Sequence, residues 1–108
     1  MSKYDREILK YSDPVKVLEN LHQVFGKDSG IELFRSNRKD KKYAIINPYT
    51  FKVVNFGQMG YEDYTKHNDE SRREQFLRRN KKWRDADPFS PAFLSYWLLW
   101  WEKLICFF

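Results

Sequence analysis

The feature that most constrains the fold is an apolar, tryptophan-rich run from Phe93 to Phe108. Three of the chain's four tryptophans lie in this run, and only Ser95, Glu102 and Lys103 interrupt its apolar and aromatic side chains. A helix that spans a bilayer needs about 20 mainly apolar residues. This run of sixteen residues is too short and carries charges, so it predicts a buried helix from Pro91 to Phe108.

The predicted C-terminal helix is apolar on nearly every side. Its main stripe, at helical spacing, consists of Phe93, Leu94, Trp97, Leu98, Trp101, Leu104, Ile105 and Phe108, while Tyr96, Leu99, Trp100 and Phe107 lie outside the stripe. Such a helix must be buried on several sides, and a small chain has little protein to do this. We therefore expect apolar anchors that bind a neighbouring subunit, with insertion into a membrane interface as the alternative. The expected anchors are Phe93, Trp97, Leu98, Trp100 and Trp101.

The preceding residues predict a small α+β unit. Asp13-Pro14 is a typical helix start and Gly26 a typical stop, which indicates a helix from Pro14 to Phe25. Three runs rich in β-forming residues follow, and the last two are separated by a short turn that is typical of a hairpin. The expected antiparallel strands are Ile31–Ser36, Lys42–Asn47 and Lys52–Phe56.

A second helix is predicted to begin after Asp69 and to carry Phe76, Leu77, Asn80 and Trp83 on one face. The complete expectation is one domain over residues 1–108, with about three helices and a small three-stranded antiparallel sheet. Residues 1–12 form an N-terminal arm that docks or frays, residues 13–84 the α+β core, and residues 92–108 the apolar C-terminal helix.

Positive charge is concentrated on the second predicted helix. Residues 66–84 hold eight Lys and Arg against three acids, an excess equal to the net charge of +5 of the whole chain. Three interpretations stay open: contact with nucleic-acid phosphates, docking onto an acidic protein surface, or a solvated face with pairs such as Glu74 with Arg78. The expected electrostatic partner-binding residues are Arg72, Arg73, Arg78, Arg79, Lys81 and Lys82.

Residues that could carry chemistry are few and scattered. The lone cysteine, Cys106, cannot form an intramolecular disulfide, and with His22 and His67 it does not make a metal-binding pattern. Glu62, Asp63 and His67 are close in sequence, but such a cluster more often caps a helix or closes a loop. We therefore expect no enzyme activity, no cofactor, no metal and no small-molecule substrate.

Several tyrosines near the hairpin suggest a platform for stacking nucleobases. RNA-binding sheets carry their aromatic residues in a glycine-rich strand motif, which this sequence lacks. Core packing is therefore the expected role of Tyr43, Tyr49, Tyr61 and Tyr64.

From Lys42 to Trp100 the chain resembles short uncharacterised or virion-associated proteins of large nucleocytoplasmic DNA viruses and some phages. The matching segments are Lys42–Pro48, Val53–Gly57, Gly60–Asp69, Ser71–Arg73, Phe76–Asn80, Phe89–Pro91, Phe93–Ser95 and Leu98–Trp100. This resemblance implies a minor capsid protein that binds and cements neighbouring coat subunits, located in the virion and, during assembly, in the host cytoplasm. Its partners would be other capsid proteins. The alternative is a small basic viral nucleic-acid-binding protein.

Overall fold

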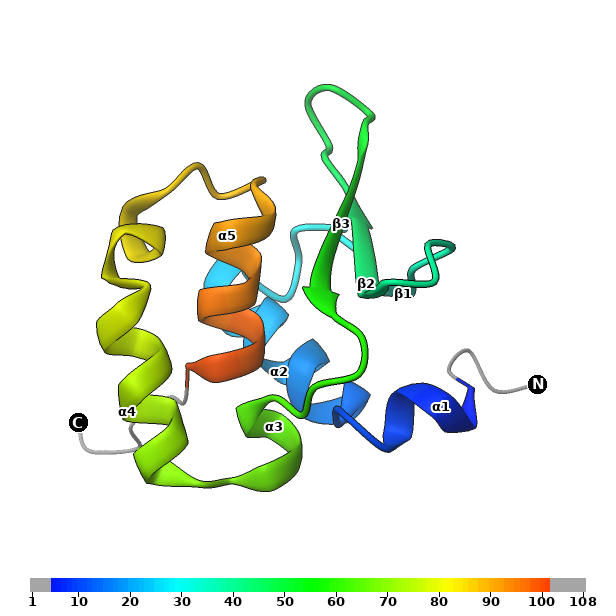
Figure 1. The fold of residues 1–108 in the computed structure, drawn as a ribbon. Helices are drawn as coiled ribbons and strands as arrows, with labels where there is room; N and C mark the ends of the chain where they lie inside the picture. The colour runs from blue at the N-terminus through cyan, green and yellow to red at the C-terminus, as the bar shows by residue number, and fades with distance from the viewer. Residues whose placement is uncertain (1–4, 102–108) are drawn as a thin grey trace.

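The chain alternates short helices with a three-stranded sheet, and the computed structural model describes residues 5–101. The α+β class expected from the sequence is confirmed (Figure 1). In chain order the elements are α1 (Arg6–Leu9), α2 (Pro14–Phe25), β1 (Phe34–Arg35), β2 (Lys41–Ile46), β3 (Val53–Gln58), α3 (Tyr64–His67), α4 (Glu70–Arg79), the 3₁₀ turn η1 (Lys81–Asp85), α5 (Pro91–Leu94) and the π-helical turn η2 (Ser95–Trp100).

The sheet is antiparallel with the order β1-β2-β3. Tyr43 of β2 lies opposite Phe56 of β3, and both side chains are fully buried. The predicted hairpin is confirmed: its turn is closed by the amide of Asn47 donating to the carbonyl of Lys52 at 2.9 Å. The strand bounds differ from the expected ones, since β1 has only two residues and β3 continues to Gln58.

Helix α2 begins and ends where the sequence predicts. The side chain of Asp13 accepts a hydrogen bond from the amide of Val15 at 3.1 Å, and Gly26 ends the helix with a φ of +92°. Its apolar side packs into the core, where Val17 and Leu21 are fully buried. The N-terminal arm is docked over its described part, because Ile8 of α1 is also fully buried.

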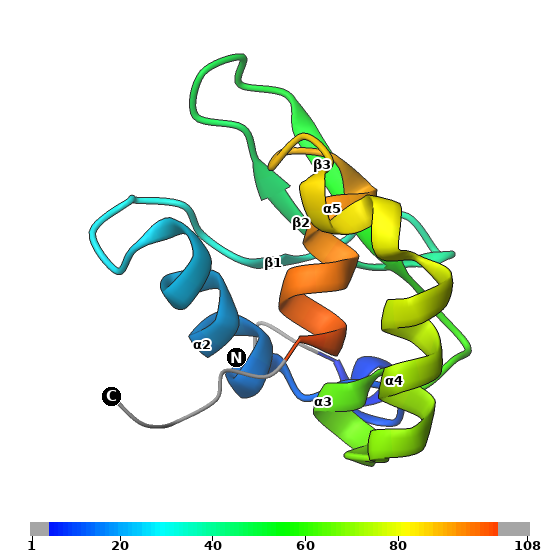
Figure 2. The same ribbon diagram turned by 90° about the vertical axis from the view of Figure 1, so that its left-hand side faces the viewer.

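Segments α5 and η2 form one continuous helical stretch, which we name the central helix, between α2, α4 and the hairpin (Figures 1 and 2). The expected helix to Phe108 is corrected here, because the helical conformation ends at Trp100 and Trp101 is extended. The rest of that prediction lies outside the described residues. In η2 the hydrogen bonds run i→i+5, so each turn holds more residues than in an α-helix. A stripe drawn at α-helical spacing therefore drifts, and Leu99, which lies outside it, is buried.

The expected surplus of apolar surface on this helix is smaller than predicted over residues 91–101, and the rest of that prediction lies outside the described residues. Helices α2, α3 and α4, the turn η1 and strand β3 all contact α5 or η2, so the chain covers much of this helix and leaves Phe93, Trp97 and Trp100 half-buried. The fully buried core comprises Ile8, Val17, Leu21, Leu33, Tyr43, Ile45, Phe56, Leu94 and Leu98, with Leu99 2% exposed. Within residues 5–101, no helix is long and apolar enough to cross a membrane.

Candidate functional site

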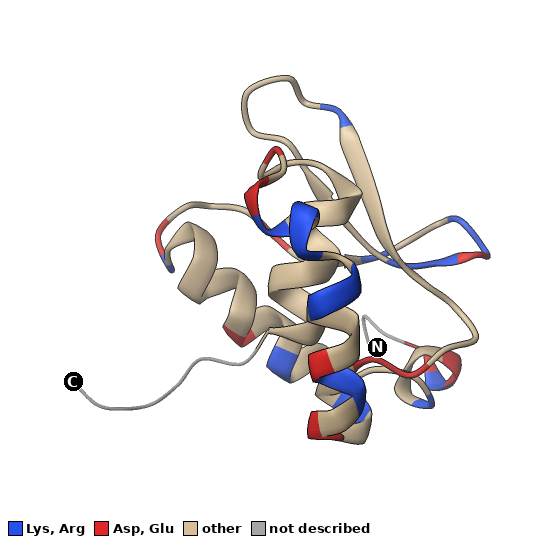
Figure 3. Cartoon of the chain, turned by 60° about the vertical axis from the view of Figure 1, so that its left-hand side comes forward, with Lys and Arg blue, Asp and Glu red and all other residues tan. Residues whose placement is uncertain are grey.

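The exposed side of α4 and η1 carries a dense group of positive charges. Asp69 caps α4 by accepting a hydrogen bond from the amide of Arg72 at 3.2 Å, as the sequence predicts, and no residue of α4 is buried. Figure 3 shows the basic residues along α4 and the turn that follows it. We name the six exposed cations of this segment the cationic ridge: Arg72, Arg78, Arg79, Lys81, Lys82 and Arg84.

Most of the cationic ridge lacks an acidic partner. Arg72 lies 4.0 Å from a carboxylate oxygen of Glu62, an exposed pair that contributes little energy. For the other five cations, no ion pair within 4.0 Å forms among residues 5–101, and the pair considered between Glu74 and Arg78 is absent from that part of the chain. Their charge is available to attract an anionic partner.

Arg73 is not available to a partner, contrary to the expectation from sequence. Its Nε donates to the carbonyl of Trp100 at 3.0 Å, and its Nη1 donates to Glu70 at 3.3 Å. The guanidinium also lies 5.2 Å from the centre of the Tyr64 ring, within the range of a cation–π interaction, and its side chain is only 15% exposed. Arg73 therefore fastens α4 to the end of the central helix.

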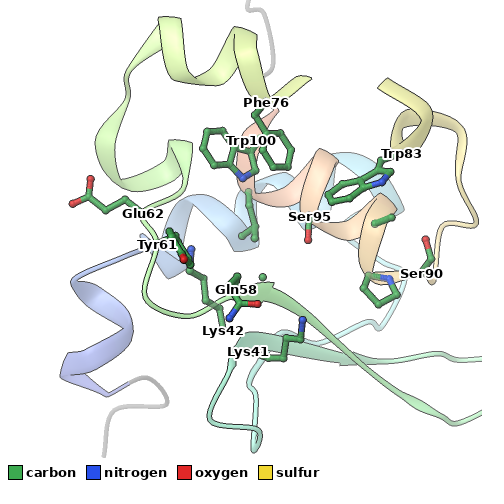
Figure 4. Close-up of a pocket in the computed structure, with 14 residues that line it drawn as sticks. Lys41, Lys42, Gln58, Tyr61, Glu62, Phe76, Trp83, Ser90, Ser95 and Trp100 are labelled. Carbon is green, nitrogen blue, oxygen red and sulfur yellow. The ribbon is translucent and has the colours of Figure 1, made fainter. Parts of the chain in front are cut away.

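An open groove of about 650 Å³ separates the sheet from α4, η1 and α5. Figure 4 shows Phe76, Trp83 and Trp100 on its helical side and Lys41 on its strand side. The rings of Phe76 and Trp100 stack at 4.2 Å with an angle of 6°, and Trp83 lies edge-on to Phe76 at 5.8 Å. We name this feature the aromatic groove. Offset and edge-on contacts of this kind hold aromatic walls in fixed positions.

The floor of the groove depends on a glycine. Gly57 has a φ of +83°, and a Cβ there would lie 2.9 Å from Cδ1 of Leu99 and 3.2 Å from Cβ of Lys42. Only glycine adopts this backbone conformation freely and leaves space for both neighbours. Strand β3 and the central helix can approach each other closely at this point.

A buried ion pair lies beside the floor. Nζ of Lys42 is 3.0 Å from Oδ2 of Asp63, with side chains 3% and 1% exposed. Burial lowers the pKa of Lys42, and the charge of Asp63 opposes this shift. Thr65 donates a short hydrogen bond to Asp63, and its hydroxyl also pairs with Ser12 at 3.2 Å. This network ties β2 and α3 to the loop before α2.

Glu62, Asp63 and His67, which are close in sequence, are not assembled as a catalytic site. The carboxylate of Asp63 is paired with Lys42 in the interior, and the carboxylate of Glu62 lies beside Arg72 at the surface. Nδ1 of His67 accepts a hydrogen bond from the amide of Asp69 at 2.9 Å, and its ring lies 5.2 Å from that of Trp100. Burial, reinforced by the charge of Arg72, lowers the pKa of His67. These groups hold the loop and α3 in place, in agreement with the prediction that such a cluster caps a helix or closes a loop.

The predicted apolar anchors have different positions. Leu98 is fully buried in the core, so its expected role in partner binding is wrong. Trp100 forms part of the aromatic groove. Phe93, Trp97 and Trp101 are half-buried and border a second hollow of about 430 Å³ next to α2. Trp97 is held there by its Nε1, which donates to the carbonyl of Arg84 at 3.0 Å.

The hairpin tip is an exposed apolar feature that the sequence analysis missed. Core packing is confirmed for Tyr43 and Tyr64, but Tyr49 is 81% and Tyr61 69% exposed. Phe51, at the tip, is 80% exposed and has a φ of +62°, which is uncommon for a bulky residue. This exposure could have been predicted from the position of Tyr49 and Phe51 within the predicted turn, where side chains seldom reach a core.

Among residues 5–101, no group of three or more His, Cys, Asp or Glu side chains is placed to hold a metal ion.

The comparisons with known proteins identify a family and no activity. No curated protein and no solved structure matches the chain. Residues 31–84, half of the 108 residues, match the model of a family of unknown function (DUF5754), and the protein therefore belongs to that family.

Proposed function

We propose that this protein is a non-catalytic structural protein that binds an acidic surface of larger coat subunits and cements them in a virion. The viral setting rests on the sequence resemblance alone. The observation that carries the docking function is the cationic ridge, in which five exposed cations have no acidic partner among residues 5–101. A concentrated positive field of this kind orients an anionic partner and accelerates its association.

Charge alone gives little affinity, because exposed ion pairs contribute only about 0–1 kcal/mol each. Strong interfaces combine a polar or charged rim with buried aromatic and Arg side chains. The aromatic groove lies on the same helical segment as the cationic ridge, since Phe76 comes from α4 and Trp83 from η1. This arrangement suits a partner that is acidic and also offers apolar side chains.

Nucleic acid is the second candidate, favoured by the presence of aromatic rings beside the cations. Single-strand binders combine these two features, and their affinity falls steeply as salt rises and counterions are released. The two candidates therefore differ in the polyanion that they prefer and in the role of the rings.

The test compares labelled polyglutamate with single-stranded and duplex oligonucleotides of equal charge, titrated with the full chain at two salt concentrations. The ridge variant replaces Arg78, Arg79, Lys81 and Lys82 by Glu. A matched control with the same change in net charge replaces four exposed cations elsewhere: Arg6, Lys10, Lys27 and Lys39. We expect polyglutamate binding that the ridge variant loses and the control largely keeps.

Equal losses in both variants would show an effect of net charge alone and would remove the ridge from the proposal. Tighter binding of an oligonucleotide than of polyglutamate would favour the nucleic-acid candidate instead. The virion setting is tested separately by mass spectrometry of purified particles. We expect the protein in a fixed ratio to the major coat protein, and its absence from the particles would refute that setting.

A further inference from the structure

The aromatic groove has the size and lining of a binding site. Its volume of about 650 Å³ lies within the range of roughly 300–1,000 Å³ that is typical of ligand pockets. Rings and aliphatic groups dominate the lining, and the uncharged side chains with a hydroxyl or amide there are Gln58, Tyr61, Ser90 and Ser95. An apolar side chain is suited to this lining. A nucleobase would also have to take its polar edge groups out of water, which is costly for every group that finds no hydrogen bond.

The groove is formed before any ligand arrives. Phe76 is fixed by its stack with Trp100, and Trp83 packs edge-on against Phe76. The turn that carries Trp83 is itself held to the central helix, because the carbonyl of Arg84 accepts the hydrogen bond from Trp97. A preformed site avoids much of the ordering cost of binding.

The charges around the groove favour an acidic occupant. Lys41 borders it on the strand side. On α4, Arg72 and Arg79 are four residues before and three residues after Phe76, so they share the face that borders the groove. Glu62 is the one acid that lines it among the described residues, and Arg72 lies beside that carboxylate.

We propose that the aromatic groove binds one large apolar or aromatic side chain from an acidic segment of the partner protein, whose carboxylates contact Lys41 and the cationic ridge. This inference rests on the proposed function, because the same acidic partner supplies both contacts. It adds the chemical class of the recognised segment: an extended acidic peptide with a single bulky apolar residue.

The experiment measures fluorescence polarisation of two labelled nine-residue peptides with the full chain. Both consist of Asp and Glu, and they differ only at the central position, which is Trp in one and Ser in the other. Burying one large apolar side chain corresponds to roughly a ten- to hundredfold gain in affinity. We expect a preference of that size for the Trp peptide.

Two groove variants locate the preference. Trp83→Ala removes a wall, and Tyr61→Ala removes a lining side chain that is 69% exposed and therefore contributes little to folding. The matched control, Tyr49→Ala, removes an exposed aromatic side chain of the hairpin tip, outside the groove. We expect the preference for the Trp peptide to fall in both groove variants and to persist in the control. Circular dichroism checks that each variant is folded. If Trp83→Ala does not fold, the result with Tyr61→Ala decides the test.

The outcomes separate this inference from the proposed function. Equal binding of both peptides, lost in the ridge variant, would refute the groove inference and leave ridge docking intact. Binding of neither peptide would refute both. A preference for Trp that persists in the groove variants would place the apolar contact elsewhere and overturn the assignment. In a competition assay, the labelled Trp peptide is displaced either by a single-stranded oligonucleotide or by the unlabelled Trp peptide. Displacement by a lower concentration of the oligonucleotide than of the unlabelled peptide would overturn the assignment in favour of nucleic acid.

Discussion

Replacing Gly57 by alanine should cost the fold about 2–5 kcal/mol, because two independent penalties meet at this position. The first is conformational: a φ of +83° places the residue in the left-handed region, which costs an L-residue roughly 1–2 kcal/mol. The second is steric. The new Cβ would lie 2.9 Å from Cδ1 of Leu99, and 3.2 Å and 3.3 Å from Cβ and Cδ of Lys42.

Neither neighbour can withdraw easily. Leu99 is 2% exposed and belongs to the core of the central helix, while Lys42 is held by its ion pair with Asp63. Forcing extra volume into such a packed site typically costs about 1–3 kcal/mol. The same substitution should also disturb the floor of the aromatic groove, because Gly57 and Leu99 both line it.

Urea unfolding followed by circular dichroism measures this loss, and Gly30→Ala is the matched control. Gly30 has a similar φ of +79°, but a Cβ at this position would meet no atom within 4 Å, so only the conformational penalty of roughly 1–2 kcal/mol applies. The difference between the two variants isolates the steric part. Equal losses in the two variants would refute the close approach of β3 to the central helix.

Three further predictions test single features. Phe51→Gly should stabilise the protein by about 1 kcal/mol in thermal unfolding, because glycine adopts the positive φ of +62° without strain; a loss of stability would show that the ring packs. Lys42→Met should cost about 3–5 kcal/mol by leaving Asp63 buried and unpaired, and adding Asp63→Leu should recover much of it; additive losses in the double-mutant cycle would contradict this. Burial lowers the pKa of His67, so the stability gained from its neutral form is fully present above the unfolded pKa near 6.5 and is lost as pH falls from that value through the lower folded pKa. His67→Asn, which keeps an acceptor for the amide of Asp69, should flatten the pH dependence, and an unchanged slope would assign it to another group.

Local signals in the sequence predicted the local structure well. The cap at Asp13, the stop at Gly26 and the cap at Asp69 act within one helical turn, so they could be recognised without any tertiary information. The hairpin was predictable for the same reason, since its turn and both strands are adjacent in the sequence. The length of β1 was not, because it depends on pairing with β2 across a loop.

The surroundings of the tryptophan-rich helix could not be predicted in this way. Periodicity shows how much of a helix is apolar, but it does not show how many other segments the chain will bring against it. Here α2, β3 and α4, which all precede the helix in the sequence, converge on it, so a helix that looked too apolar for so small a chain is its central element. The widened turns of η2 then moved Leu99 into the core.

For the candidate site, too, the local features were predictable from the sequence and the tertiary contacts were not. The charge excess of residues 66–84 was visible in the sequence, but the roles of adjacent cations were not: Arg72 is exposed, whereas Arg73 is fixed against Trp100. Pairing depends on what lies opposite each side chain after folding. The aromatic groove was invisible for a related reason, because Lys41, Tyr61 and Trp83 come from separate elements that only the fold brings together.

The family match adds a final constraint on how the site is built. Residues 31–84 contain the sheet, α4 and most of η1, and so they hold the whole cationic ridge and the groove residues Lys41, Tyr61, Phe76 and Trp83. The helix that fills the core and supplies Trp100 follows this span. A sheet must bury its apolar face against another layer, and α4 has no buried residue with which to do so. The segment that carries the binding surfaces therefore depends on α2 and the central helix, from outside it, to hold those surfaces in place.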